Sequence, residues 1–237
     1  MGTISWQDLY TKQTGLYDEL VRSEDFQGNL MAALQQIRPI ARKELAEFGA
    51  GTGRLTTQLI AQARLVSAFD LTPAMLALAY KKLKATNQTN WRLGVADSRA
   101  MPLPTASVDL ALEGWSIAQI KAWNPETWQD SVGTALEEMF RVVRPGGAII
   151  LIETLGTGAT APHPPDQFVP LYDYFEQTWQ LAKTWVRTDY RFPSQSAAQR
   201  TIGALFGEAV VATGWESADG YVIPECTGIW WVGKSER

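Results

Sequence analysis

An alternation of short apolar runs with helix-like segments constrains the fold of residues 43–153 more than any other feature. Three of the runs, KELAEF (43–48), LVSAFD (65–70) and AIILIE (148–153), have the length and composition of buried strands. Segments with apolar residues at helical spacing lie between such runs, and the connections are short. Buried strands that alternate with helices form parallel sheets covered on both faces. The sequence therefore predicts an α/β fold with a doubly wound, mostly parallel sheet.

Local signals mark the other elements of this region. A helix is expected to begin at Thr72, because threonine is a good N-cap and the proline that follows suits the first helical position. A second helix is expected to be capped by Asn124 and to be ended by RPGG (144–147). Two further strands are expected around 90–97 and over 108–114.

The flanking regions have a different rhythm. We expect one domain over residues 1–237, with a helical N-terminal arm (1–38), a core (40–155), a lid-like insert (156–182), and C-terminal strands and a helix (183–237). Residues 156–170 are rich in Gly, Pro and Thr and are predicted to form a loop. After it we expect a helix (168–182), a strand (185–190), a helix (196–213) and a final strand (228–233).

The composition excludes several classes of protein. With 46% hydrophobic and 19% charged residues, the chain is expected to be globular. Its one cysteine, Cys226, and one histidine, His163, allow neither an internal disulfide nor a Cys- or His-rich metal site, so no metal is expected. No apolar run reaches the ~18 residues of a membrane span, and nothing at the N-terminus reads as a signal peptide. We therefore expect a cytoplasmic protein. The net charge of −4 argues against wrapping of duplex nucleic acid.

The stretch AEFGAGTGRL (46–55) predicts a ligand site where a strand meets a helix. Its glycines follow G-x-G-x-G, and Arg54 occupies the position that the third glycine of the dinucleotide fingerprint would need. Glu47, two residues before the first glycine, would repel a pyrophosphate and attract a cation. This pattern favours S-adenosylmethionine (SAM), which carries an ammonium and a sulfonium and no phosphate, although the glycines alone could form only a tight turn.

Three motifs carry a resemblance to a known family. ELAEFGAGTGRLTTQL (44–59) resembles motif I of the class I SAM-dependent methyltransferases. VADSRAMPLPTASVDLAL (95–112) is similar to the third-strand motif of their ubiquinone/menaquinone-biosynthesis-like (type 11) branch, and FRVVRPGGAIILIE (140–153) resembles the lead into strand five. The resemblance covers roughly residues 40–155 and implies a seven-stranded, Rossmann-like sheet with SAM as cofactor.

By this resemblance the cofactor site comprises Glu47, Gly49, Ala50, Gly51, Gly53, Asp70, Leu71, Asp97, Ser98 and Glu113. Asp70, about 20 residues past the first glycine, can accept from both ribose hydroxyls and would repel a 2′-phosphate. Asp97 would accept from the adenine amino group, and Leu71 would face the adenine ring. Simpler structural interpretations remain open, because Asp70 could complement a helix start and Asp97 could belong to a turn.

The methyl acceptor is less constrained by the sequence. Methyl transfer needs a general base only when the nucleophile is protonated and poorly acidic, so no catalytic residue is assigned. Glu113, His163 and Tyr17 are candidates, and Glu113 could instead cap a helix. EGWS (113–116) stands where nucleobase N-methylating relatives carry an Asn/Asp-Pro-Pro-aromatic signature, which favours a small-molecule acceptor over nucleic acid.

Two other functions were weighed against a methyltransferase. A SAM- or S-adenosylhomocysteine-binding module without transferase activity would need the same Glu47, Asp70 and Asp97. A nicotinamide-dependent dehydrogenase is disfavoured by Glu47 and Arg54. The acceptor atom, the pathway and the oligomeric state are left open by the sequence.

Overall fold

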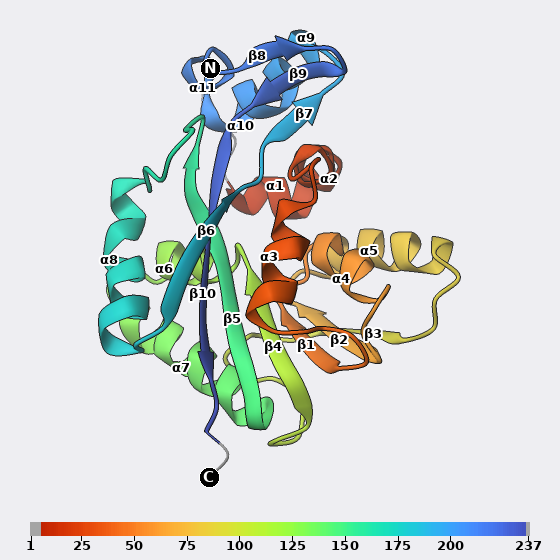
Figure 1. Ribbon diagram of the computed structural model, residues 1–237, viewed down its shortest axis with the longest axis vertical. Coiled ribbons are helices and arrows are strands. Elements are labelled where there is room, and N and C mark those ends of the chain that lie inside the picture. The colour runs from red at the N-terminus through yellow and green to blue at the C-terminus, as the bar shows by residue number, and fades with distance from the viewer. Residues whose placement is uncertain (1–5, 236–237) are drawn as a thin grey trace. The chain divides into compact units, whose positions relative to one another are not determined.

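The computed structural model describes residues 6–235, so residues 1–5 of the expected arm lie outside the described residues. The chain forms two compact units (Figure 1). The core unit comprises Gln35–Glu153, Asp166–Thr184 and the chain from Ile229 onward. The appended unit comprises the chain up to Leu34, Thr154–Pro165 and Trp185–Gly228.

A seven-stranded sheet, in the order β3-β2-β1-β4-β5-β10-β6, confirms the expected architecture. Its strands are β1 (Glu44–Phe48), β2 (Leu65–Asp70), β3 (Trp91–Val95), β4 (Val108–Gly114), β5 (Val143–Thr157), β6 (Ala182–Arg187) and β10 (Glu225–Gly233). The five strands from β3 to β5 are mutually parallel. The strand order reverses between β1 and β4, and ligands of open α/β sheets bind at such a reversal, outside the carboxyl ends of the strands.

One strand makes the sheet mixed. The backbone N–H of Lys234, just past the end of β10, donates to the carbonyl of Gly147 at 2.8 Å, and the N–H of Gly146 donates back at 2.9 Å. The end of β10 therefore lies beside the start of β5, and the two strands run in opposite directions (Figure 1). "Mostly parallel" is thus the correct description of the sheet.

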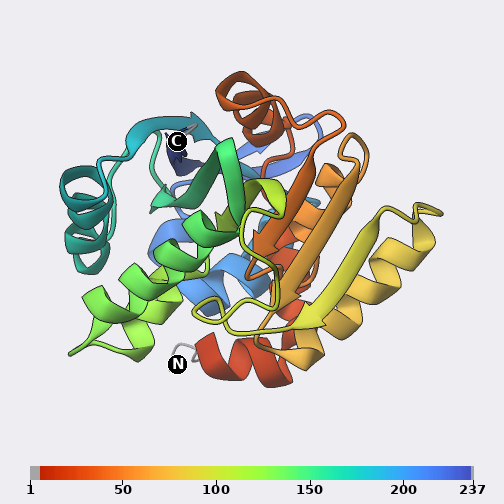
Figure 2. The same cartoon turned by 90° about the horizontal axis from the view of Figure 1, so that it is seen from below.

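Helices cover both faces of the parallel strands (Figure 2). In the core unit they are α4 (Arg54–Leu59), α5 (Pro73–Ala85), α6 (Ile117–Trp123), α7 (Trp128–Val142), the short helix Asp166–Phe168, α8 (Val169–Asp173) and the π-helical turn Tyr174–Thr178. Because both faces are covered, Leu45, Phe48, Leu112 and Ile150 on the central strands are fully buried.

Two expectations for the core unit were wrong. Asn124 does not begin the helix before RPGG. It ends α6, a helix that the sequence reading missed, and α7 begins at Trp128 after Thr127. RPGG (144–147) does not precede the strand that was expected at 148–153. It belongs to the first part of β5, where the pairing register with β4 shifts. Gly146 has a φ of +81°, a conformation that favours glycine and permits this irregular start.

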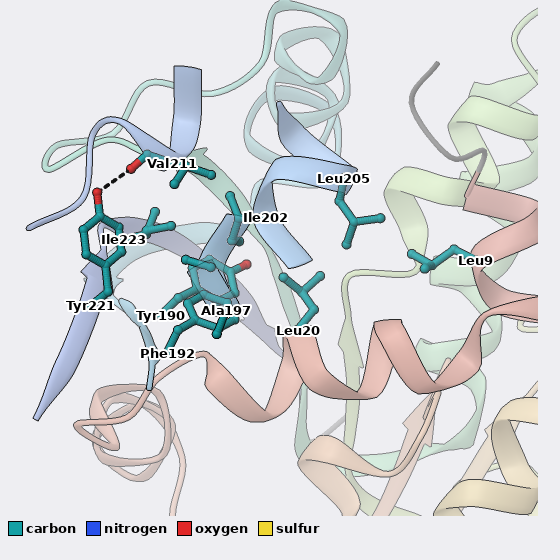
Figure 3. Packing of buried hydrophobic residues seen from close by; sticks show 11 residues of the cluster. Leu9, Leu20, Tyr190, Phe192, Ala197, Ile202, Leu205, Val211, Tyr221 and Ile223 are labelled. Carbon is teal, nitrogen blue, oxygen red and sulfur yellow. Dashed lines mark hydrogen bonds between the residues drawn. The ribbon is translucent and has the colours of Figure 1, made fainter. Parts of the chain in front are cut away.

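The appended unit combines helices with a small antiparallel sheet, β7-β9-β8. Its elements are α1 (Trp6–Lys12), α2 (Thr14–Ser23), β7 (Tyr190–Phe192), α9 (Gln195–Ala198), the π-helical turn Gln199–Gly203, α10 (Ala204–Phe206), α11 (Glu208–Val211), β8 (Trp215–Ser217) and β9 (Gly220–Ile223). The remaining helix, α3 (Asn29–Ile37), has residues in both units. Leu9 and Leu20 from the helices pack in one cluster with Phe192, Ile202 and Ile223 (Figure 3).

This part of the chain departs most from the sequence expectations. The helix expected over 196–213 is broken at Gly207, whose φ of +93° ends α10. The strand expected over 185–190 is divided into the end of β6 and the start of β7. In the same unit, β8 and β9 were not foreseen, and in the core unit the helix expected over 168–182 stops at Thr178. Among the described residues, no helix combines the length and apolar character that crossing a bilayer requires.

Candidate active site

The glycine loop joins β1 to α4 at the carboxyl edge of the sheet. Gly49, Gly51 and Gly53 have φ values of +71°, +55° and +80°, all in the left-handed region that other residues rarely adopt. A Cβ atom on Gly49 would also collide with the side chain of Ser116. These glycines are therefore required by conformation and by close packing, and they leave bare backbone at the point where the strand order reverses.

Glu47 is the last residue but one of β1, two residues before the first glycine of this loop. Its side chain is 2% exposed, and its Oε2 accepts a hydrogen bond of 2.6 Å from Oγ1 of Thr56. Burial raises the pKa of Glu47 to about 8, although the bond from Thr56 opposes this rise. In the part of the chain that the structure describes, no lysine, arginine or histidine forms an ion pair with Glu47. A buried carboxyl without a basic partner is suited to receive a cationic ligand group.

Asp70 connects the end of β2 to the glycine loop. Its Oδ2 accepts from the backbone N–H of Gly51 at 2.8 Å, and its Oδ1 accepts from that of Thr72 at 2.7 Å. Burial raises the pKa of Asp70, and the two backbone bonds oppose the rise. Thr72 is the N-cap of α5 and Pro73 is its first residue, as expected, although the Thr72 side chain makes no capping hydrogen bond. A carboxylate can accept about four hydrogen bonds, so Asp70 can serve the helix start and a ligand together.

The third-strand residues lie at the next strand end. Both carboxylate oxygens of Asp97 accept from the Arg99 guanidinium, at 2.9 Å for Nε and 2.6 Å for Nη2, and this pairing lowers the pKa of Asp97. Ser98 lies between the two. Leu71 and Val95, next to the paired ends of β2 and β3, are 53% and 58% exposed. Exposed apolar side chains beside Asp70 offer a surface for an apolar ring.

Glu113, at the end of β4, serves as a helix cap. Its Oε1 accepts from the backbone N–H of Ser116, from Ser116 Oγ at 2.7 Å, and from the N–H of Ile117 at 2.9 Å. The structural alternative for this residue is therefore correct. Its Oε2 is buried and has no hydrogen-bond partner among the described residues, so a ligand contact is also compatible with the geometry. Next to the cap, the Arg54 guanidinium lies 4.0 Å from the centre of the Trp115 ring.

Sequence reasoning missed Glu153, which ends the most apolar run of the chain. Its side chain is 1% exposed, and its Oε1 accepts from the backbone N–H of Ala118 at 2.8 Å. Burial and the neighbouring Glu113 raise the pKa of Glu153 well above the usual value. A carboxyl at the end of an otherwise continuous apolar run (148–153) was the available signal.

The other two acceptor-side candidates, Tyr17 and His163, belong to the appended unit. The Tyr17 ring meets the edge of Tyr10 at a centroid distance of 5.3 Å. His163 is exposed, and its backbone N–H donates to the carbonyl of Leu155 at 2.6 Å. Their catalytic roles stay predictions.

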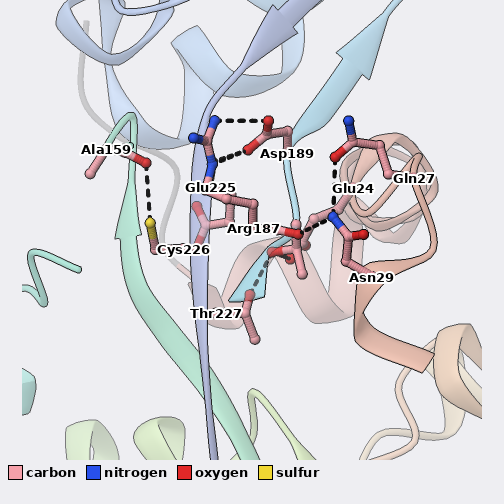
Figure 4. Close-up of polar contacts among 10 residues, drawn as sticks. Glu24, Gln27, Asn29, Ala159, Arg187, Asp189, Glu225, Cys226 and Thr227 are labelled. Atoms are coloured by element: carbon pink, nitrogen blue, oxygen red, sulfur yellow. Dashed lines mark hydrogen bonds and ion pairs between the residues drawn. The ribbon is translucent and has the colours of Figure 1, made fainter. Parts of the chain in front are cut away.

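A second group of buried polar residues lies in the appended unit (Figure 4). Arg187 donates to both carboxylate oxygens of Asp189, at 2.7 and 2.8 Å. The hydroxyls of Thr188 and Thr227 are 2.6 Å apart, and the Cys226 thiol donates to the carbonyl of Ala159 at 3.3 Å. Across the described residues, no group of three or more His, Cys, Asp or Glu side chains is arranged to hold a metal ion.

Comparison with known proteins shows what this fold and site resemble. Residues 45–147, less than half of the chain, match the family model described as a methyltransferase domain. This segment resembles the class I SAM-dependent methyltransferases, whose cofactor is S-adenosylmethionine. The matched residues include the glycine loop, Glu47, Asp70, Asp97 and Glu113, and the buried carboxyls of Glu47 and Glu113 fit a ligand that carries positive charge.

Particular relatives refine this placement. The chain is 28% identical over 150 residues to malonyl-[acyl-carrier protein] O-methyltransferase of Serratia marcescens, covering 63% of this chain and 52% of that protein. It is 38% identical over 120 residues to an uncharacterized methyltransferase of Mycobacterium tuberculosis, covering 51% and 43%. The chain thus spans about half the length of the curated relatives it matches. A solved SAM-dependent methyltransferase from Aquifex aeolicus shares the fold, with a TM-score of 0.56, 14% identity and coverage of 85% and 87%.

Proposed function

We propose that this protein binds SAM at the carboxyl edge of the core sheet and transfers its methyl group to a small-molecule acceptor in the cytoplasm. The observation that carries the proposal is Glu47. It is a buried carboxyl with a raised pKa, it has no basic partner among the described residues, and it stands two residues before the first of three left-handed glycines. A positive ligand group near this carboxyl would favour its ionised form.

Each predicted cofactor residue has a role that its position supports. Glu47 and the backbone of Gly49 to Gly53 would hold the charged amino-acid end of SAM, and Asp70 would accept from the ribose hydroxyls. Leu71 would cover the adenine ring, with Asp97 and Ser98 at its edge. SAM supplies an electrophilic methyl group on its sulfonium. The protein then has to align the acceptor and exclude water.

The acceptor is proposed to be a small molecule because EGWS (113–116) replaces the signature of nucleobase N-methylation and the net charge is −4. The Serratia relative's name prints a malonyl group on an acyl carrier protein as its acceptor, which makes small acyl groups a reasonable first panel. Glu113 is the best placed candidate base, because burial raises its pKa and one carboxylate oxygen has no partner among the described residues.

Calorimetry with SAM, S-adenosylhomocysteine and NAD tests the binding step. We expect the first two to bind and NAD not to bind, and the reverse result would contradict the proposal. Methyl transfer is then measured with labelled SAM against an acceptor panel. Tight binding with no transfer to any acceptor, in the presence of both units, would instead favour the alternative of a SAM- or S-adenosylhomocysteine-binding sensor or scaffold.

A further inference from the structure

Two buried glutamates from neighbouring strands hold the turn after β4. The register of β4 and β5 makes Glu113 and Glu153 diagonal neighbours on one face of the sheet. Glu113 Oε1 accepts from the backbone N–H groups of Ser116 and Ile117, and Glu153 Oε1 accepts from that of Ala118. Three consecutive N–H groups at the start of α6 are therefore bound by two carboxyls.

Among the described residues, no lysine or arginine forms an ion pair with either glutamate, and the Arg54 guanidinium on α4 lies over the Trp115 ring. Within the described part of the chain, the other charged groups on β1, β4, β5, α6 and α7 have partners elsewhere or face solvent. Arginines bind three of the acids, since Arg144 pairs with Glu44 and Asp109, and Arg141 pairs with Glu138. Glu47 accepts from Thr56, Lys121 lies over the Trp128 ring, and Asp130 and Glu137 are exposed. Two adjacent buried carboxylates without a cation cannot both stay ionised. One proton is therefore retained, and Glu113 Oε2, buried with no partner among the described residues, is available to share it.

The turn held by these glutamates contacts both ends of the glycine loop. The Ser116 side chain occupies the space that a Cβ on Gly49 would fill. One residue earlier, the Trp115 ring stacks on the guanidinium of Arg54 at 4.0 Å. A shift of residues 114–118 would therefore disturb the backbone that is proposed to receive SAM.

We propose that Glu113 and Glu153 share one proton and act together as positioning residues, which hold residues 114–118 in the arrangement that keeps the glycine loop competent for SAM. This inference rests on the proposed function. Loss of the shared proton leaves two buried like charges, and their repulsion displaces the turn. Because burial raises the pKa of both carboxyls, the proton is lost above the usual range of glutamate. The affinity for SAM is then limited by the fraction of protein that still holds the proton.

Glu153→Gln tests the pair. Glutamine keeps an oxygen for the Ala118 N–H and places an N–H donor toward Glu113 at every pH, so it imitates the protonated pair. Binding of S-adenosylhomocysteine is measured by calorimetry from about pH 6 to about pH 9. We expect the ratio of the wild-type Kd to the variant Kd to be near one at low pH and to rise about tenfold per pH unit above the pKa of the pair. Glu137→Gln, an exposed site on α7, is the matched control and should give a flat ratio.

If the ratio of the wild-type Kd to the Glu153→Gln Kd does not change with pH, the inference is overturned. Other effects of pH on binding are common to both proteins and cancel in this ratio. If circular dichroism shows that Glu153→Gln does not fold, Glu153→Met, which also removes one of the two buried charges, gives the same comparison. If the wild type binds neither SAM nor S-adenosylhomocysteine, the proposed function fails. Hydrogen exchange at the amides of residues 116–118 then still tests the pair. Protection should be lost with rising pH faster in the wild type than in Glu153→Gln, and equal loss would contradict the shared proton.

Discussion

The two units of this protein both bury carboxylates but compensate them differently. In the appended unit, Asp189 is 7% exposed and receives two hydrogen bonds from Arg187. In the core unit, Glu47 and Glu113 are at least as deeply buried, and neither forms an ion pair with a described residue. Burial therefore raises the pKa of both core glutamates, whereas an arginine satisfies Asp189.

This difference distinguishes a structural polar cluster from a site that awaits a ligand. An internal ion pair fixes its own geometry and leaves little for a partner to gain. A buried carboxyl without a cation stores an unfavourable interaction that a positively charged ligand removes. We therefore expect substitutions in the two units to affect different quantities, namely ligand affinity in the core unit and stability in the appended unit.

The largest effect is expected for Gly51→Val. A β-branched side chain at a φ of +55° is strained, and it would stand where the ligand must approach the backbone. We expect calorimetry to detect no SAM binding while circular dichroism keeps a helical spectrum. Gly207→Val, at another left-handed glycine with open space around it, is the control for strain alone and should retain binding. Tight binding of SAM by Gly51→Val would show that the glycine loop forms only a tight turn and does not contact the ligand.

Arg187→Ala should act on stability alone. Removal of the guanidinium leaves the Asp189 carboxylate buried without its partner, which costs about 3 kcal/mol in comparable pairs. Urea unfolding should show this loss, whereas the affinity for S-adenosylhomocysteine should be unchanged. Adding Asp189→Asn should restore part of the stability, since the uncompensated charge is then removed. A weakened affinity with no loss of stability would reverse the assignment of the two units.

Asp70→Ala should weaken SAM binding by about 1.5–3 kcal/mol, the range for a charge-assisted hydrogen bond. Asp109→Ala is a matched control, because Asp109 also accepts a backbone N–H, from Glu44 at 2.8 Å, but lies at the opposite end of the strands. It should lower stability and leave affinity unchanged. Calorimetry on the folded variants decides between a ribose contact and a purely structural carboxylate at position 70.

Some of the elements on which these predictions depend could be predicted from the sequence, and others could not. The strands at 65–70 and 108–114 were predicted residue for residue, because continuous apolar runs between turns define buried parallel strands locally. Helix α6 was missed although Glu113 was considered as a possible cap, because the second carboxyl at its N-terminus, Glu153, belongs to another strand. A cap supplied from a distance leaves no local signal.

The same reason explains what was missed in the site. The glycine loop and Asp70 follow from spacing along the chain, whereas Glu153 comes beside Glu113 only through the register of β4 and β5. In the appended unit, β8 and β9 have three and four residues, too few for a period to be recognised. The break at Gly207 depends on a left-handed conformation that periodicity does not detect.

The pH dependence of the free energy of unfolding should report the raised pKa of Glu47. Its folded-state pKa is raised from 4.5 to about 8, so the folded protein binds more protons than the unfolded chain between these values. The free energy of unfolding should therefore fall as pH rises through this window, by at most about 1.4 kcal/mol per pH unit. Glu47→Gln should lack this contribution in urea unfolding at a series of pH values.

Ligand binding should lower the pKa of Glu47, whereas burial raises it. A bound cation lowers the pKa of this carboxyl, so SAM binding near neutral pH should release a proton. Calorimetry in two buffers with different ionisation enthalpies measures that release. Identical proton release in wild type and Glu47→Gln would show that another group titrates.

The smallest effect is expected in residues 10–29 of the N-terminal arm and residues 156–175 of the lid-like insert, which we expect to become ordered when the cofactor binds. Displacement at a sulfonium requires water to be kept out, so these segments should gain protection when S-adenosylhomocysteine binds. The amides of Gly158 and His163 already donate to Pro224 and Leu155 within the appended unit, so the change there should be modest. Hydrogen exchange is compared with that of residues 196–213, which belong to the appended unit's helices and should not respond. Equal exchange with and without ligand in both segments would show that they do not respond to the cofactor, and the acceptor pocket would then be sought around Glu113 and Trp115.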